Sequence, residues 1–392
     1  MGILSNTVSI VQYQVTGKLP EKDTDEWLEQ CLTGARFKSI EDTADEESIG
    51  WVNLDDHLAS DFSNHFTFKR DHFLATTLRS DKRKVSSFLR KNYLSREYER
   101  FLDEHPKLRS VPRSEKEQIK DRIEFNLLTK TLPATNVVDL VWNTDAGIVT
   151  VTTTSLKTME LIEEYFRETF GGLGLTVVHP MARAEMVMDD SYEDRLKKIN
   201  QASIPDTLAQ IQDNLWAGRE FLLWLMFGTR KTDSVYKITQ PGPFDNEEPY
   251  VAYLDDRIVL VGESEDENED GVRKSAITGS QSDFAEARKA IQKGKTITEG
   301  TIYFEKNDLT WKLTLKGDIF SFGSFKCPSV KIEKDELTDR AAEREAVFFE
   351  RMHLLESGLQ MFNSLYARFL FERMGKDWPE KFAQINDWVR EK

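Results

Sequence analysis

The sequence predicts an α+β protein of more than one domain, and three observations support this fold class. The chain has 392 residues, enough for two or three domains, because one domain usually takes about 100–200 residues. Hydrophobic residues make up 39% and charged residues 31% of the chain, the profile of a globular protein with real cores. A helical excursion over residues 80–132 lies between segments that alternate as strands do, which indicates a helical insertion in an α+β domain.

The first 80 residues are predicted to form a β-α-β unit followed by a hairpin. Residues 8–15 alternate between apolar and polar side chains, which is typical of a strand. A helix with one apolar face follows, and Asp23 or Thr24 can cap its N-terminus. Residues 65–68 and 72–78 are rich in aromatic and β-branched side chains, so we expect two strands joined by a turn.

The inserted segment is predicted to contain two helices. Residues 82–102 have the pattern of a basic amphipathic helix. Two prolines within residues 103–113 indicate a linker. Ser114 and Glu117 form a capping-box pattern, which predicts the start of a second helix that ends before Pro133.

The rest of the chain continues both patterns. Strands or strand-rich segments are predicted at 137–142, 147–153, 172–178, 234–262 and, as a group of three, between 296 and 325. Helices are predicted at 155–169, 190–228, 284–293, 337–374 and 378–389. Residues 263–271 hold six acids and predict a solvated loop.

The composition argues against several classes of protein. Cys31 and Cys327 are isolated, so neither a disulfide framework nor a structural zinc site is expected, and free thiols fit a reducing compartment. The N-terminus lacks the basic start and apolar run of a signal peptide. Residues 221–227 are too few to span a bilayer, and they predict either a buried helix or an exposed patch for a partner. We therefore expect a cytoplasmic protein with no membrane segment.

The charge of the chain is unevenly distributed. A net charge of −15 argues against a nucleic-acid partner, because duplex DNA is polyanionic. Residues 69–130, however, contain 17 Lys and Arg against 10 Asp and Glu, a local net charge of +7 that leaves −22 for the remainder. A basic segment in an acidic protein is a candidate surface for phosphates.

Nine cations in this part of the chain are predicted to contact the DNA backbone: Lys69, Arg70, Arg79, Lys82, Arg83, Lys84, Arg90, Lys91 and Arg96. Each phosphate contact would release counterions. The alternative is a solvated helix face of ordinary charge. No base-reading motif accompanies the segment, so binding without sequence preference is expected. Changing Lys82, Arg83 and Lys84 together to Glu is expected to weaken binding without unfolding the protein.

The chain contains none of the common catalytic motifs, since no Walker A loop, GxGxxG, GxSxG or HExxH occurs. Two loose groups of residues have side chains typical of metal or nuclease sites: His57 and His65 with Asp55, Asp56 and Asp61, and Asp139 with Lys157 and Glu160. Neither has the spacing of a known site. We predict no catalytic residue, metal or cofactor; a metal-dependent exonuclease and an acidic interaction scaffold that binds no DNA remain alternatives.

Several segments resemble the RdgC (recombination-associated protein) family, and they occur in the order found in that family. The matching segments are Gly50-Trp51-Val52, 116–128, 137–178, 273–304, 309–328 and the stretch around 337–375. The resemblance extends over about three quarters of the chain and rests on pattern and order.

The resemblance implies a three-part protomer and a ring-shaped homodimer. A central α/β sandwich-like domain would comprise residues 1–79 and 133–180, a helical tip residues 80–132, and an α+β base residues 181–392. Two protomers of the family close around double-stranded DNA, bind it without sequence preference and restrain RecA-promoted strand exchange. A cytoplasmic, nucleoid-associated protein follows. No catalytic residues are established in the family, despite an old exonuclease label.

The resemblance also places the contacts between protomers. Lys130 and Leu132 match the contact at the tip, where the family has an aromatic residue at the position of Leu132. Arg273 and Lys274 match a basic patch at the contact in the base. An insertion at about 205–250 and the extension after Met374 have no counterpart in shorter members, and the high acidity is a further departure.

Overall fold

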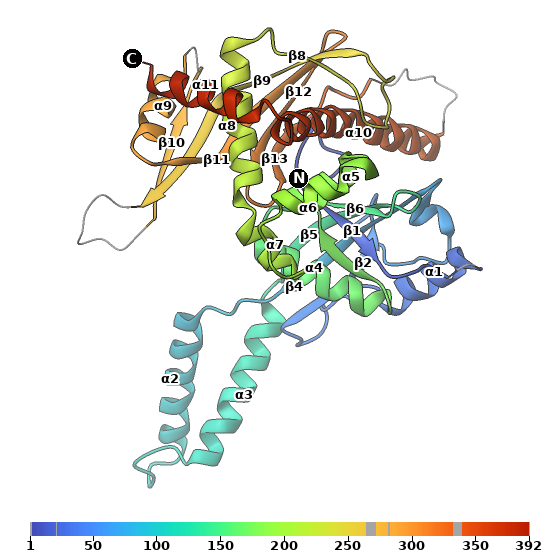
Figure 1. The fold of residues 1–392 in the computed structure, drawn as a ribbon. Coiled ribbons are helices and arrows are strands. Elements are labelled where there is room, and N and C mark those ends of the chain that lie inside the picture. The colour runs from blue at the N-terminus through green and yellow to red at the C-terminus, as the bar shows by residue number, and fades with distance from the viewer. Residues whose placement is uncertain (1, 21, 264–271, 281–282, 332–338, 392) are drawn as a thin grey trace. The chain divides into compact units, whose positions relative to one another are not determined.

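The computed structural model describes the chain except residues 1, 21, 264–271, 281–282, 332–338 and 392 (Figure 1). The predicted loop at 263–271 thus lies almost wholly outside the described residues. The fold is α+β with a large antiparallel sheet, as the sequence predicts. The chain divides into two compact units. Unit 1 comprises Met1–Thr16, Ala146–Glu163 and Gly174–Lys392, and unit 2 comprises Gly17–Asp145 and Glu164–Leu173.

Unit 1 contains an antiparallel sheet in which β10, β9, β11, β12, β13 and β1 are neighbours in that order. The strands β6 and β7 pair with β1, and β8 pairs with β9. The strands of this unit are β1 (Thr7–Thr16), β6 (Ile148–Val151), β7 (Gly174–Val177), β8 (Val235–Lys237), β9 (Pro249–Glu263), β10 (Val272–Thr278), β11 (Thr296–Lys306), β12 (Leu309–Lys316) and β13 (Ser321–Lys326). Val8 lies opposite Phe325, so the N-terminal strand completes a sheet formed by the C-terminal half of the chain.

Helices cover one face of this sheet. The helices of unit 1 are α5 (Pro180–Val187), α6 (Glu193–Ile199), α7 (Thr207–Asp213), α8 (Leu215–Lys231), α9 (Ala285–Gln292), α10 (Arg340–Arg373) and α11 (Trp378–Arg390), with a 3-10 turn η2 (Asp190–Tyr192). In β12 the side chains of Trp311, Leu313 and Leu315 are buried, while the residues between them are not. This alternation is that of a sheet with one covered face. The Nε1 of Trp311 donates to the carbonyl of Leu354, which joins β12 to α10.

The apolar run at 221–227 belongs to the core of unit 1. Phe221, Leu222 and Leu225 on α8 are fully buried. The ring of Phe221 lies 5.4 Å from Tyr366 and 5.8 Å from Phe362, both on α10. The prediction of a buried helix is therefore confirmed, and the alternative of an exposed patch is wrong for this run.

Unit 2 contains a smaller antiparallel sheet in the order β2, β4, β5, with β3 paired to β4. Its elements are α1 (Thr24–Gly34), β2 (Glu47–Asn53), η1 (His65–Thr67), β3 (Lys69–Arg70), β4 (Phe73–Lys82), α2 (Ser87–Glu104), α3 (Arg113–Lys130) and β5 (Ala134–Asn143). The helix α4 (Leu156–Thr169) contributes residues to both units. Trp51 and Trp142 pack in the core with Phe170, and Trp51 donates to the hydroxyl of Thr169 at 2.9 Å.

Two predicted boundaries in unit 2 are wrong. Residues 65–67 form the 3-10 turn η1, because the side chain of Asn64 accepts the amide of Phe66 and starts a turn in place of a strand. The helix predicted from residue 82 begins at Ser87. Lys82 is instead the last residue of β4, where it lies opposite Glu47 and Ala134. The basic run at 82–84 is thus not helical.

Candidate nucleic-acid interface

The basic helices α2 and α3 form an antiparallel hairpin with a small core of its own (Figure 1). Val111, Ile119 and Ile123 are buried, and they pack against the partly buried side chains of Leu94, Tyr98, Phe101, Leu102 and Leu127. Two ion pairs also join the helices. Arg90 meets Glu124 at 2.7 Å, and Arg122 meets Glu97 at 3.0 Å. The cations of the hairpin therefore lie around a small apolar core between the two helices.

Two of the cations predicted to contact DNA are buried beside β4. Arg79 forms a two-bonded fork with Asp81, with distances of 2.9 and 2.7 Å, and its guanidinium lies over the ring of Phe37. Burial raises the pKa of the Asp81 carboxyl, but hydrogen bonds, chiefly from Arg79, outweigh burial and lower it overall. Arg70 is also buried and pairs with Asp55 at 2.5 Å. Both guanidinium groups already have partners inside the protein.

Arg83 is the third buried cation of the predicted set, with 4% of its surface exposed. Its guanidinium donates to the backbone carbonyls of Ile40, Glu41, Thr43 and Asp45. The side chain thus holds the loop before β2 closed, since a guanidinium offers five donors in a fixed plane.

This placement corrects one expectation from the sequence. Changing Lys82, Arg83 and Lys84 together was expected to leave the fold intact. Replacing Arg83 by Glu would remove four hydrogen bonds and bring a carboxylate to four carbonyl oxygens. The triple change therefore cannot separate DNA binding from folding.

Three predicted cations are accessible but already paired with carboxylates. Lys69 pairs with Asp25, and Lys82 pairs with Glu47 at 2.6 Å. The hydrogen bond between Lys82 and Glu47 raises the pKa of the lysine and lowers that of the carboxyl. Arg90 is held by Glu124, as described above. Exposed pairs of this kind contribute little to the stability of a fold, so these cations can exchange a carboxylate for a phosphate at small cost.

The remaining three predicted cations are Lys84, Lys91 and Arg96. All are exposed, and the described residues provide none of them with an ion pair or a side-chain hydrogen bond. They lie on or just before α2. Of the nine cations predicted to contact DNA, these three are exposed and have no partner among the described residues.

Four further cations of the hairpin meet the same two conditions but were not singled out from the sequence: Lys107, Arg109, Lys116 and Lys120. They lie in the turn and on α3, where Glu115, Glu117 and Asp121 interrupt the run of positive charge. The available signal was the local count of charges over residues 69–130, which includes all four.

The residues predicted to contact a second protomer are all accessible. Leu132 is 84% exposed, and Lys130 at the end of α3 is exposed as well. Phe88 on α2 and Phe125 on α3 are exposed large apolar side chains of the same hairpin. Phe88 lies within the predicted amphipathic helix, but its side chain is 70% exposed.

In unit 1, Arg273 and Lys274 lie on β10, and both are exposed. Lys274 pairs with Glu299 at 2.7 Å. Because β9 is the paired neighbour of β10, these two residues lie on a strand at the edge of the sheet. Edge strands are surfaces through which chains commonly associate.

The residues considered for a metal or nuclease site are mostly engaged with other partners. His57 lies 3.9 Å from Asp139, whose carboxylate accepts the hydroxyl of Thr77 at 2.7 Å. His65 lies 3.4 Å from Glu29. Asp139 and Glu160 belong to different units. Within the described parts of the chain, no three His, Cys, Asp or Glu side chains are grouped so that they could hold a metal ion.

Part of the chain is similar to a known protein family. The family model described as "Putative exonuclease, RdgC" matches residues 9–191, which include all of unit 2 and the α2–α3 hairpin. No curated protein sequence matches the chain. The described helices include none that is both long and apolar enough to cross a membrane.

Proposed function

We propose that this chain, which is similar to the RdgC family over residues 9–191, binds duplex DNA without sequence preference and restrains RecA-dependent recombination. The α2–α3 hairpin would supply much of the DNA surface. Two protomers would close into a ring around the duplex, which makes the oligomer isologous and the contacts self-complementary. Duplex occupied in this way would be a poor substrate for a recombinase filament.

One observation carries the proposal: eight cations of the hairpin region are exposed without a partner in the described part of the chain. In sequence order they are Lys84, Lys91, Arg96, Lys107, Arg109, Lys116, Lys120 and Lys130. A cation that is not paired with a carboxylate can neutralise a phosphate without breaking a contact inside the protein. Such contacts follow the backbone and carry no sequence information. The net charge of −15 on the whole chain makes this local surplus more informative, because the protein as a whole repels DNA.

A salt titration of DNA binding tests the proposal. We expect the logarithm of the association constant for a random-sequence duplex to fall linearly with the logarithm of salt concentration. Changing Lys84, Lys91 and Arg96 together to Gln removes three phosphate contacts from each protomer and six from the proposed ring, so the slope should become shallower by about 5.4. Fluorescence anisotropy with a labelled duplex measures both curves.

The matched control changes Lys289, Lys293 and Lys376 to Gln. These residues are exposed in unit 1, and the change alters the net charge by the same amount. Its slope should equal that of the wild type. If the two triple variants give the same curve, the hairpin is not the DNA surface, and the effect is one of overall charge.

The description of the matching family favours DNA degradation as a second candidate function. It is tested with the same protein and an end-labelled linear duplex in the presence of Mg²⁺ or Mn²⁺. Progressive shortening that a chelator stops would establish an exonuclease. Intact ends after many molar equivalents of enzyme would leave binding as the activity.

A further inference from the structure

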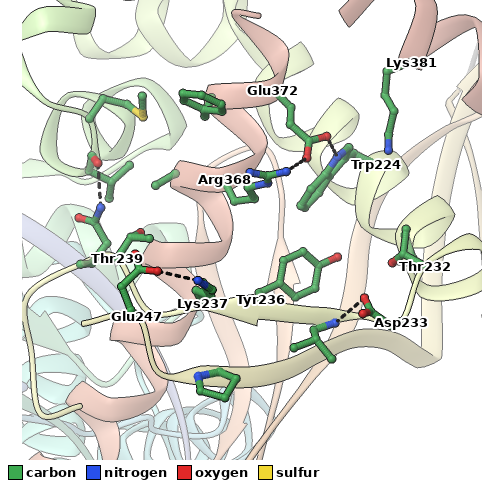
Figure 2. Close-up of a pocket in the computed structure, with 18 of the residues that line it drawn as sticks. Trp224, Thr232, Asp233, Tyr236, Lys237, Thr239, Glu247, Arg368, Glu372 and Lys381 are labelled. Carbon is green, nitrogen blue, oxygen red and sulfur yellow. Dashed lines mark hydrogen bonds and ion pairs between the residues drawn. The ribbon is translucent and has the colours of Figure 1, made fainter. Parts of the chain in front are cut away.

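Unit 1 contains a cleft of about 830 Å³ that has no part in the proposed DNA surface. It is lined by α8, β8, the C-terminal part of α10, the start of α11 and the segment from Val187 to Tyr192. Most of its lining residues come after residue 191 and thus lie outside the match to the family. Figure 2 shows Trp224, Arg368 and Lys381 along one side of the cleft, and Tyr236, Lys237 and Asp233 along the other.

The strand β8 has a free edge at this cleft. Its pairing with β9 uses the even-numbered residues: the amide of Ile238 donates to Glu248, and the carbonyl of Ser234 accepts from Ala252. In an antiparallel pair the intervening residues point their polar groups the other way. The outward-facing groups are therefore those of Val235 and Lys237.

These outward-facing groups are largely unused. The amide of Val235 donates to the carboxylate of Asp233 at 3.3 Å. In the described part of the chain, no partner is recorded for the carbonyl of Val235 or for the amide and carbonyl of Lys237. Two acceptors and one donor at the spacing of a strand are what an added strand needs for pairing. A compact small molecule has no such repeating set of groups.

The wall of the cleft offers an apolar seat beside this edge. The rings of Trp224 and Tyr236 lie 5.8 Å apart, and Phe371 on α10 is 51% exposed. Gly228 makes room for Tyr236, since a Cβ at this glycine would lie 3.0 Å from the phenolic oxygen. Part of the polar wall is internally satisfied, because Glu372 accepts from Trp224 at 3.0 Å and pairs with Arg368 at 2.9 Å.

Among the described residues that line the cleft, Lys381 is a cation that is left for a ligand. Lys237 is neutralised by Glu247 at 2.7 Å, and Arg368 is neutralised by Glu372. The amine of Lys381 lies 5.4 Å from the centre of the Phe227 ring, and no carboxylate pairs with it among the residues that the structure describes. An amine at an aromatic wall favours an acidic group next to an apolar one.

We propose that this cleft binds a short extended peptide segment of a partner protein. The peptide adds a strand to the free edge of β8, places an apolar side chain against Trp224 and Tyr236, and brings a carboxylate to Lys381. Main-chain hydrogen bonds provide the affinity, and the apolar seat and the amine provide the selectivity. The interaction is separate from DNA binding and from the hairpin of unit 2.

Selection from a phage-displayed library of random heptapeptides on the full-length protein tests the proposal. We expect enriched sequences with apolar residues at alternating positions and an acidic residue nearby. A synthetic peptide of the enriched sequence should slow amide exchange in residues 232–240, measured by mass spectrometry. If no sequence is enriched over empty wells, or if the exchange of this segment is unchanged, the proposal is wrong.

Two substitutions at one position isolate the strand edge. Lys237→Pro removes the outward amide without breaking a bond to β9, because Lys237 lies opposite Pro249 in a pair that exchanges no hydrogen bonds. Lys237→Ala keeps the amide and removes the side chain. Peptide affinity should fall at least tenfold in the proline variant and less than threefold in the alanine variant.

The amine is tested by Lys381→Gln, with Lys376→Gln as a control of equal charge on the exposed turn before α11. Only Lys381→Gln should weaken peptide binding. This loss of affinity should disappear when the acidic residue of the peptide is changed to its amide. Equal binding by all four variants would overturn the proposal. DNA binding should be unaffected in each, which shows that the proteins are folded.

Discussion

Several cations of this protein stabilise the fold and are not available for binding, and Arg83 is the clearest case. Four carbonyl oxygens of one loop depend on its guanidinium. We expect Arg83→Ala to lower the free energy of unfolding by about 2–4 kcal/mol, because it leaves these acceptors without their donor. Lys84→Ala, one residue later and exposed, should change it by less than about 0.5 kcal/mol. Urea unfolding followed by tryptophan fluorescence measures both, and equal effects would contradict this role.

A buried histidine should make the stability of the protein depend on pH. His179 precedes α5, and its Nδ1 accepts the amide of Ala182, so the ring is held in its neutral form. Burial lowers its pKa from 6.5 to about 4. Between pH 4 and pH 6.5, the unfolded chain therefore binds a proton that the folded chain does not bind. The contribution to stability is complete above pH 6.5 and is lost as the pH falls towards 4, at a cost of about 3 kcal/mol.

The substitution His179→Asn tests this pH dependence. Asparagine keeps an acceptor for the amide at the helix start but does not titrate. The variant should lose about 3 kcal/mol less than the wild type between pH 6.5 and pH 4 in urea unfolding. His353→Asn, at an exposed position on α10, serves as the control and should leave the wild-type pH profile unchanged. A wild-type profile in His179→Asn would show that another group causes the acid sensitivity.

At the scale of single residues, the sequence shows where cations occur but not whether each one is paired inside the fold or available for binding. Counting Lys and Arg over residues 69–130 locates the basic part of the chain. It cannot show that Arg79 turns back to Asp81, or that Arg83 caps a loop 40 residues earlier in the chain. Asp81 lies two residues from Arg79 on the same strand, whereas the loop that Arg83 holds is brought close to it by the pairing of β2 with β4. The buried position of both side chains depends on the tertiary structure, which separates internal cations from available ones.

At the scale of elements, the α2–α3 hairpin depends on a core of its own. Ile123 is 6% exposed within that core. We expect Ile123→Ala to destabilise the hairpin by about 2–5 kcal/mol through lost burial and a residual cavity. Amide exchange of residues 87–130 should accelerate while that of unit 1 stays the same. Phe125→Ala removes a side chain that is 58% exposed on the same helix, and it should have little effect; acceleration throughout the chain in Ile123→Ala would show that the hairpin does not have independent stability.

The two C-terminal helices were predicted well from the sequence, and the short elements were not. The single helix predicted at 190–228 is wrong, because the segment is divided into η2, α6, α7 and α8. The helix predicted at 378–389 is α11, Trp378–Arg390, and the helix predicted at 337–374 is α10, Arg340–Arg373. Their apolar positions repeat over several turns, so the signal accumulates. Residues 65–68 carry only four side chains of pattern, and the cap from Asn64 decides their conformation locally. Lys82 has a basic helical neighbourhood, but ten consecutive pairs with β5 keep it in β4.

At the scale of the whole molecule, acidity and DNA binding are compatible only if the two kinds of charge are separated. Residues 69–130 carry +7 and the remainder −22. The screening length at physiological salt is about 8 Å, so a phosphate in contact with the hairpin responds to its nearest cations more than to distant carboxylates. The association rate should respond to the whole charge, while the salt slope reports the local contacts.

The proposed ring makes a prediction that no open binding surface would make. A protein closed around DNA should remain on a nicked circular plasmid after a high-salt wash, because salt removes the ionic contacts but not the topological link. It should be lost from the same plasmid after linearisation, since it can slide off the ends. Retention is measured by size-exclusion chromatography of the washed DNA.

The exposed side chain of Leu132 allows a test of whether retention on circular DNA depends on the dimer. Leu132→Glu places a charge where the proposed contact at the tip would bury an apolar side chain, and an unpaired buried charge is costly. We expect the mass in solution to fall from twice 45.4 kDa towards 45.4 kDa, and retention on circles to be lost, whereas Leu132→Met keeps both. Because Leu132 is 84% exposed in the single chain, the change should leave the thermal unfolding of the protomer unaltered. A Leu132→Glu protein that stays dimeric and stays on circles would show that the tips do not close the ring.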